Sequence, residues 1–242
     1  MVRLPSEHAR HRNAPRISAN ELARYMVAGM TGRIGIIRRA RDAEPATTTR
    51  YAKVREDIKD YLCDRGRTQR YFAALHNKYA AMADDAELSS WAREDARLSV
   101  DVLASLARME NQIGGNSFIP APSRQPFLTL QGVTVSVNLN VLMTRERGGK
   151  SEVGGVLFRM TKADAETETA AAKRKDIGAF AATLALMQVQ NGLAGDRLPH
   201  HQLCASFDVQ CEDVHAAPRN YVSKAKELEN GCRFIAAMWD SA

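Results

Sequence analysis

The fold class is decided by residues 133–162, which read VTVSVNLNVLMTRERGGKSEVGGVLFRMTK. Apolar and polar residues alternate over Val133–Val141, which is the period of a half-buried strand. The pair Gly148–Gly149 follows and is typical of a hairpin turn. Val153–Lys162 then returns as a partner strand. We therefore expect an antiparallel pair in this part of the chain.

More strands and helices are expected on either side of this pair. Residues 127–130 have the alternation of a first strand. Residues 164–191 have the apolar spacing of a long helix, and residues 202–209 read as a further strand. A last helix is predicted over residues 220–239. Together these elements predict a mixed α/β core over residues 127–242.

The period changes in the first half of the chain, where residues 17–115 are predicted to be helical. Ser18 and Glu21 have the spacing of a capping box, which predicts that a helix begins there. Gly29, Gly32 and Gly35 weaken the middle of that helix and predict a break or close packing there. Three further helices have an apolar stripe at helical spacing. They are expected over residues 51–64, 68–82 and 87–113.

Two segments have compositions that favour irregular structure. Residues 1–16 contain four arginines against one glutamate, and we expect a mobile basic arm. Residues 116–126 are rich in Pro and Ser and are predicted to be a linker. The whole pattern predicts an α+β protein, with a helical N-terminal half, a strand-strand-strand-helix-strand core and a C-terminal helix.

Composition narrows the function classes. The net charge of +6 favours acidic partners, either nucleic acid or an acidic protein surface, although an ordinary Arg-rich composition explains it equally well. The four cysteines form no CxxC pair and lie at no zinc-finger spacing, which indicates free thiols in a reducing compartment. No apolar run approaches the roughly 20 residues that span a bilayer. We expect a cytoplasmic protein without membrane contact.

The order of a long helix, three strands, a helix and a strand, over about residues 87–209, resembles the core of the PD-(D/E)XK nucleases. The resemblance implies acidic residues on the second and third strands that hold a divalent metal, and a lysine that orients water. Here Asn138 or Asn140 stands at the second-strand position, and apolar Leu157 stands at the lysine position. We therefore expect no catalytic residue, no metal and no cofactor.

Residues 125–130, which read QPFLTL, resemble the QxxLxF peptide that docks on the bacterial sliding clamp. The resemblance implies that the Gln125 amide binds a small pocket and that Leu128 and Leu130 fill an apolar cleft. The alternative is that the two leucines alternate because they begin the first strand. With a degenerate nuclease scaffold, this peptide resembles the SocB-type toxins. That resemblance implies the sliding clamp, and an antitoxin or protease adaptor, as protein partners.

The run Lys173, Arg174 and Lys175 is either a solvated helix face or an anion patch. The leading functional prediction is a non-catalytic cytoplasmic binding protein, a toxin that inhibits DNA replication by binding the sliding clamp. One alternative is a DNA-binding module or a residual nuclease, for which nucleic acid is the partner. Another is a structural subunit of a bacterial or phage assembly.

Overall fold

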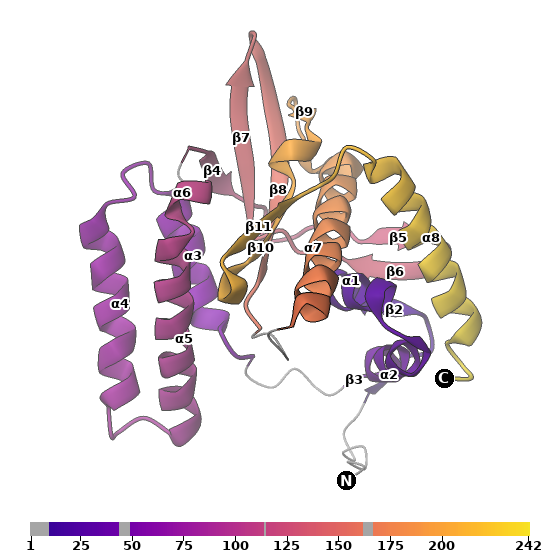
Figure 1. Cartoon of the computed structure of the whole chain (residues 1–242), viewed down its shortest axis with the longest axis horizontal. Coiled ribbons are helices and arrows are strands. Elements are labelled where there is room, and N and C mark those ends of the chain that lie inside the picture. The colour runs from indigo at the N-terminus through magenta and orange to yellow at the C-terminus, as the bar shows by residue number, and fades with distance from the viewer. Residues whose placement is uncertain (1–9, 44–48, 114, 162–166) are drawn as a thin grey trace.

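The computed structural model describes residues 10–43, 49–113, 115–161 and 167–242. Helices dominate the first half of the chain, and mixed sheets, a long helix and a C-terminal helix follow (Figure 1). The predicted α+β class is therefore confirmed. The described parts are arranged in layers, with a central sheet between a group of helices on one side and helices of both chain ends on the other.

The central sheet has six strands. They are β4 (Ser117–Pro120), β7 (Val141–Arg147), β8 (Lys150–Arg159), β9 (Leu198–Pro199), β10 (Ala205–Asp208) and β11 (Asp213–Ala216). The main path runs β11-β10-β8-β7-β4, and β9 also pairs with β8. β8 is parallel to β9 and β10, whereas the pairs β4–β7, β7–β8 and β10–β11 are antiparallel.

β7 and β8 form the hairpin that the sequence predicts. Arg147 lies opposite Lys150, and the two residues between them are Gly148 and Gly149, with φ of 57° and 72°. This left-handed conformation suits glycine and matches the twist of a two-residue hairpin turn. The glycine pair therefore sets the register of the hairpin.

The prediction of one strand over Val133–Val141 is wrong, because the chain passes between two sheets there. A small sheet has the order β2-β6-β5 and contains β2 (Arg16–Ser18), β5 (Leu128–Leu130) and β6 (Val133–Ser136). The backbone N–H of Asn140 donates to the Val156 carbonyl at 2.8 Å, and the side-chain oxygen of Asn140 accepts from the Phe158 N–H at 2.7 Å. These two bonds attach the segment between β6 and β7 to β8. The predicted antiparallel pairing with β8 is made by β7, whereas β6 pairs with β2 and β5.

The arm and linker predictions also need correction. Residues 10–16 belong partly to strands, because β1 (Arg10–His11) pairs with β3 (Asp42–Ala43) and β2 is parallel to β6. Residues 1–9 lie outside the described residues. The linker prediction fails at residues 117–120, which form the edge strand β4. Its apolar side chain Phe118 is buried, which outweighs the loop-like composition around it.

The helices predicted over residues 51–64 and 68–82 are confirmed with small changes at their ends, whereas the one predicted over residues 87–113 begins at Ser90 and is divided into two helices. The helices are α3 (Ala52–Cys63), α4 (Gln69–Asp84), α5 (Ser90–Arg108) and the short α6 (Glu110–Ile113). The Thr68 hydroxyl accepts from the Tyr71 N–H, and the Ser89 hydroxyl accepts from the Ala92 N–H, both at 3.2 Å. These side chains satisfy donors that the first helical turn leaves free.

The remaining helices lie on the other side of the sheet. They are α1 (Ala19–Val27), α2 (Met30–Arg41), α7 (Glu168–Gln188) and α8 (Tyr221–Met238). Short helical turns lie at Val189–Leu193, His201–Leu203 and Val209–Cys211, and the last of them contacts α5. The Ser18 hydroxyl accepts from the Glu21 N–H at 3.3 Å, as its spacing predicts. Gly29 separates α1 from α2. The first residues of the predicted helix 164–191 lie outside the described residues.

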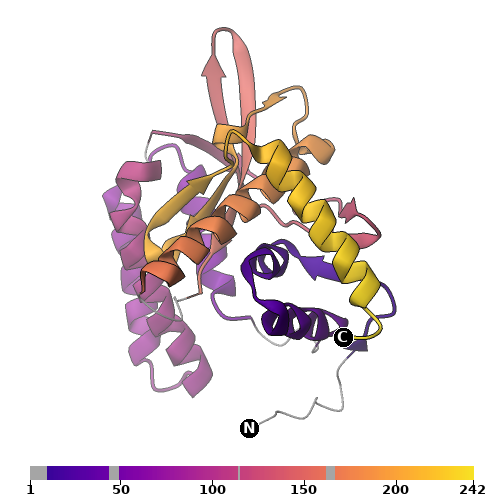
Figure 2. The same cartoon turned by 45° about the vertical axis from the view of Figure 1, so that its right-hand side comes forward.

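The central sheet separates two hydrophobic cores. Helices α3, α4 and α5 cover one face, where Phe158 and Phe207 are buried. Helix α7 covers the other face over Val153 and Leu157, and α1 and α8 pack against α7 (Figures 1 and 2). Alternate residues of β8 thus enter different cores, because successive side chains of a strand point to opposite faces.

Candidate functional site

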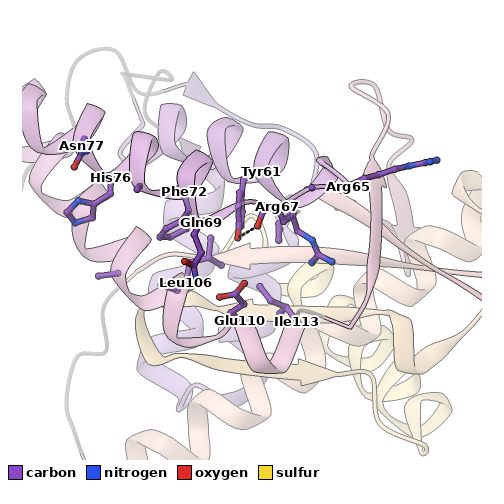
Figure 3. A pocket seen from close by; sticks show the side chains of 15 residues that line it. Tyr61, Arg65, Arg67, Gln69, Phe72, His76, Asn77, Leu106, Glu110 and Ile113 are labelled. Atoms are coloured by element: carbon purple, nitrogen blue, oxygen red, sulfur yellow. Dashed lines mark hydrogen bonds between the residues drawn. The ribbon is translucent and has the colours of Figure 1, made fainter.

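A groove of about 680 Å³ opens in the helical half, where α3, α4, α5 and α6 meet. Its volume lies within the range of roughly 300–1,000 Å³ that is typical of ligand sites. Figure 3 shows side chains from all four helices and from the turn between α3 and α4 around this groove. The site therefore depends on how these helices are held relative to one another.

The turn between α3 and α4 is tied to the edge of the sheet. The Asp64 carboxylate accepts from the Gly66 N–H at 3.1 Å. The Arg67 guanidinium donates to the Asn116 carbonyl at 3.0 Å and lies 5.6 Å from the centre of the Phe118 ring. Because α3 packs on β4 while α4 packs along α5, space remains between α3 and the α4–α5 pair.

The floor of the groove is apolar and partly aromatic. The Tyr61 ring meets the Phe72 ring edge-on at 5.2 Å and stacks with the Tyr71 ring at 5.9 Å. Leu106 and Ile113 are 2% and 3% exposed and complete the floor. Such contacts favour a fixed geometry, because aromatic pairs have preferred orientations. The floor can therefore take up apolar side chains without first rearranging.

Polar groups lie around this floor. The Tyr61 hydroxyl donates to the Arg67 carbonyl at 3.5 Å. Burial raises the pKa of Tyr61, and the nearby Glu110 carboxylate raises it further, so the phenol stays neutral at physiological pH. Arg65 extends away from the floor at one end, and His76 and Asn77 lie at the other (Figure 3). The groove thus has an apolar centre and polar ends.

This arrangement is suited to binding more clearly than to a reaction. Apolar side chains of a ligand would lose water on the floor, and the polar ends would fix its direction. Within the described ranges, no group of three or more His, Cys, Asp or Glu residues is placed to hold a metal ion.

Of the positions expected from the nuclease resemblance, Asn140 and Leu157 serve the fold. Asn138 is exposed between β6 and β7, and Leu157 is 5% exposed in the core under α7. Asn140 lies beside Leu157. Its backbone N–H and its side-chain oxygen are both bonded to the β8 backbone, one on either side of Leu157. Glu152 lies near the start of β8, where a hydrogen-bonded contact of 2.6 Å with Arg145 lowers the pKa of its carboxyl.

The clamp-like peptide is also part of the fold. The Gln125 side chain accepts from the Leu139 N–H and donates to the Leu139 carbonyl, both at 2.8 Å. Leu128 and Leu130 lie in β5 and are 6% and 8% exposed. The alternative, that these leucines alternate because they form a strand, is confirmed. Clamp binding by this segment stays a prediction and would require β5 to leave its sheet.

The three residues of the anion patch do not share one environment. Lys173 and Lys175 are exposed on α7. Arg174 turns inward and donates to both carboxylate oxygens of Asp208, at 2.6 and 3.0 Å. Asp208 is fully buried and also contacts Arg159 at 3.2 Å. Arg174 therefore belongs to an internal ion cluster, and only the two lysines remain as a surface patch.

Two groups of candidate site residues were not predicted from the sequence. Tyr61, Phe72 and Leu106 have the same helical spacing as core residues, and no sequence signal distinguishes the groove. The second group is a cluster of arginines near the N-terminus, for which the local charge of residues 10–42 is a usable signal.

The sequence matches no model of a known protein family and no curated protein. In the part of the chain that the structure describes, no helix combines the length and the apolar character needed to cross a membrane. The function is therefore inferred from the geometry of the described residues.

Proposed function

We propose that the protein is a non-catalytic binding protein whose groove between α3 and the α4–α5 pair docks an amphipathic helix of a protein partner. The observation that supports this proposal is the apolar floor of Tyr61, Phe72, Leu106 and Ile113 in an open cavity of about 680 Å³. Helix-in-groove recognition uses such a floor to bury side chains at positions i, i+4 and i+7 of the partner.

The length of the groove fits two turns of a partner helix. Its lining on α4 runs from Gln69 to Asn77, which is about 12 Å at the rise of an α-helix. Positions i and i+7 of a partner helix lie about 10 Å apart, so this length accommodates them. Small residues along the walls let a partner backbone approach closely. They are Gly66, Ala73, Ala104 and Ala107.

Charges at the groove favour one orientation of the partner. Arg65 is exposed at one end, and the Glu110 carboxylate is exposed at the wall. An acidic residue or the C-terminal end of the partner helix would be stabilised near Arg65, and a basic residue would be stabilised near Glu110. Both contacts are exposed, so they would contribute to specificity more than to affinity.

Several classes of protein could supply the helix that docks in this groove. The sliding clamp, an antitoxin and a protease adaptor are candidates that the sequence resemblance suggests, and a larger assembly is another. We also propose a cytoplasmic location, because Cys63, Cys204, Cys211 and Cys232 are all unpaired, as expected in a reducing compartment.

Two neighbouring alanines of α4 give a matched test. Ala73 and Ala74 are both exposed, but only Ala73 lines the groove. A photo-crosslinking amino acid at position 73 should capture a partner in cells, and the same group at position 74 should not. Ala73→Trp should weaken binding of the captured partner by about tenfold or more, because the indole fills the groove. Ala74→Trp should leave it unchanged.

Equal crosslinking from both positions, or none from position 73, would contradict docking in the groove. A small molecule seen by native mass spectrometry in wild type but not in Ala73→Trp would instead show a ligand pocket. Crosslinked peptides of the partner should map to a helix with apolar residues at i, i+4 and i+7. A partner segment without this pattern would contradict the proposed mode of binding.

A further inference from the structure

Positive charge is concentrated at one end of the chain. Residues 10–42 contain eight arginines, no lysine and two carboxylates, so this segment carries a net charge of +6. The whole chain also has a net charge of +6, which leaves the remaining residues neutral in sum. We name residues 10–42 the arginine-rich unit. Such an asymmetry is the electrostatic signature of a surface that binds polyanions.

The arginine-rich unit encloses a cavity of about 380 Å³ between β2, α1 and α2. Three arginines line this cavity against one carboxylate, and two serine hydroxyls lie beside them. The polar lining residues are Arg12, Arg16, Arg39, Glu21, Ser18 and Ser136. The charge at the cavity is therefore positive on balance. The Ser18 hydroxyl accepts from the Glu21 N–H and can still donate to a phosphate oxygen, whereas the Ser136 hydroxyl donates to the Ile17 carbonyl at 3.4 Å.

Other arginines of the unit hold the cavity in shape. Arg41 donates to the Trp239 carbonyl at 3.0 Å and contacts the Asp42 carboxylate at 3.2 Å. Arg33 donates to the carbonyls of Tyr25 and Met26, both at 3.2 Å. These bonds fix α2 against α1 and the C-terminal end of α8. The arginines at the cavity are thus presented by a fixed support.

One carboxylate of the cavity contacts two arginines, of which Arg39 lines the cavity and Arg24 does not. Glu21 contacts Arg24 at 3.3 Å and Arg39 at 3.5 Å. Arg12 donates one hydrogen bond to the Ala40 carbonyl at 3.2 Å. A guanidinium has five donors, so donors remain for an anion in the cavity. Arginine forks also match phosphate oxygens better than lysine does.

An aromatic platform adjoins the cavity. The Arg16 guanidinium lies over the Phe127 ring, 4.5 Å from its centre, and Phe127 is 50% exposed. The Phe127 carbonyl accepts from the Asn191 side chain at 3.4 Å, which holds the backbone of this residue. Unpaired nucleobases stack on exposed aromatic rings, and nearby guanidinium groups bind the phosphates of the same strand.

We infer that the arginine-rich unit binds single-stranded nucleic acid, with a backbone phosphate in the cavity of Arg12, Arg16 and Arg39 and a base stacked at Phe127. The aromatic platform favours a single strand over an acidic peptide, a lipid surface or a duplex, which offer no free base to the ring. This site is separate from the groove between the helices, and the inference does not rest on partner docking there.

The test uses the full chain and a fluorescein-labelled oligothymidylate of about 12 nucleotides, followed by fluorescence polarisation at about 50–200 mM salt. Arg16→Gln combined with Arg39→Gln should weaken binding about tenfold or more and reduce the salt slope by about 0.7, because the one phosphate in the cavity is no longer neutralised. The control Arg70→Gln with Arg97→Gln removes the same charge from α4 and α5 and should change affinity less than about twofold.

Two exposed phenylalanines separate stacking from charge. Phe127→Ala should weaken binding about tenfold without changing the salt slope, because base stacking contributes independently of counterion release. Phe234 is 41% exposed on α8, and Phe234→Ala should bind as wild type does. Circular dichroism at each step shows that the variants are folded.

Three results would overturn the inference. They are the absence of binding to the oligonucleotide at low salt, equal loss in the control pair, and unchanged affinity in Phe127→Ala. Duplex DNA of the same length, polyglutamate and phosphatidylserine vesicles serve as competitors. If any of them displaces the oligonucleotide at the same concentration of charge, the surface prefers that class of polyanion and the assignment to single strands is wrong.

Discussion

The helical region at residues 52–113 and the arginine-rich unit at residues 10–42 flank the same sheet from opposite sides, yet they differ in charge and in the cavities that they form. The helical region has ten basic and eleven acidic side chains, and its groove of about 680 Å³ has an apolar floor. The arginine-rich unit has a net charge of +6 and a polar cavity of about 380 Å³. The difference indicates two surfaces for two kinds of ligand.

The sheet joins these regions, and damage to it should affect both. Phe207 is fully buried in β10 and stacks with Phe158 at 6.0 Å. Phe207→Ala should reduce the free energy of unfolding by about 3–5 kcal/mol, because it leaves a cavity. Urea denaturation followed by circular dichroism should show one transition at a lower midpoint, and the exposed Phe234→Ala should change it little. Two separate transitions would show that the regions fold independently.

A second substitution tests the segment that resembles a clamp peptide. Leu128→Ala should reduce the free energy of unfolding by about 2–5 kcal/mol, because Leu128 is buried in β5. Gln125→Ala should have a smaller effect of about 1–3 kcal/mol, because it leaves the Leu139 N–H and carbonyl unpaired.

The same variants decide the clamp prediction. Surface plasmon resonance with a bacterial sliding clamp should detect binding by wild type if this segment docks, and Gln125→Ala with Leu128→Ala should abolish it in protein that is still folded. Absence of wild-type binding would reject the clamp as partner. Binding that persists in the double variant would move the contact elsewhere, with the groove as the first place to examine.

A third prediction concerns acid stability on the α7 side of the sheet. Burial lowers the pKa of His215 below its ordinary value of 6.5, although the carboxylates of Asp213 and Asp208 oppose this shift. As pH falls through 6.5, the unfolded chain takes up the proton first, so stability is lost until the folded pKa is reached. His215→Gln should flatten the free energy of unfolding over this range. An unchanged pH profile would show that His215 titrates alike in both states.

The smallest expected effect is the response of the groove to salt. Docking of a partner helix should change less than about twofold between 50 and 200 mM salt, because its floor is apolar and its charges are exposed. Nucleic-acid binding by the arginine-rich unit should fall steeply over the same range. Isothermal titration at both salt concentrations checks this. A steep dependence for the captured helical partner would show that charge, and not the apolar floor, dominates the groove.

Local signals in the sequence were sufficient for many of the individual elements. The Gly148–Gly149 turn follows from the conformation that glycine permits, and the first helix follows from the Ser18 cap. Apolar spacing was sufficient to place the helices of the helical half, and alternation indicated strands around Val133 and Val153. These signals act over a few residues, so they can be read without knowing what packs against them.

Tertiary structure decided how the elements are joined and which side chains are left for function. The expected strand over Val133–Val141 is divided because β6 ends at Ser136 and Asn140, just before β7, bonds to β8. The expected linker contains a strand because Phe118 is buried at the edge of the sheet. Gln125 bonds to a residue fourteen positions away. The groove and the arginine cavity likewise combine residues from separate elements. By itself, the sequence determined the periodicity of helices and strands, the residues of the turns and the placement of charge along the chain. The pairing of residues that are far apart in the sequence was decided by the tertiary structure, because such contacts depend on which surfaces meet.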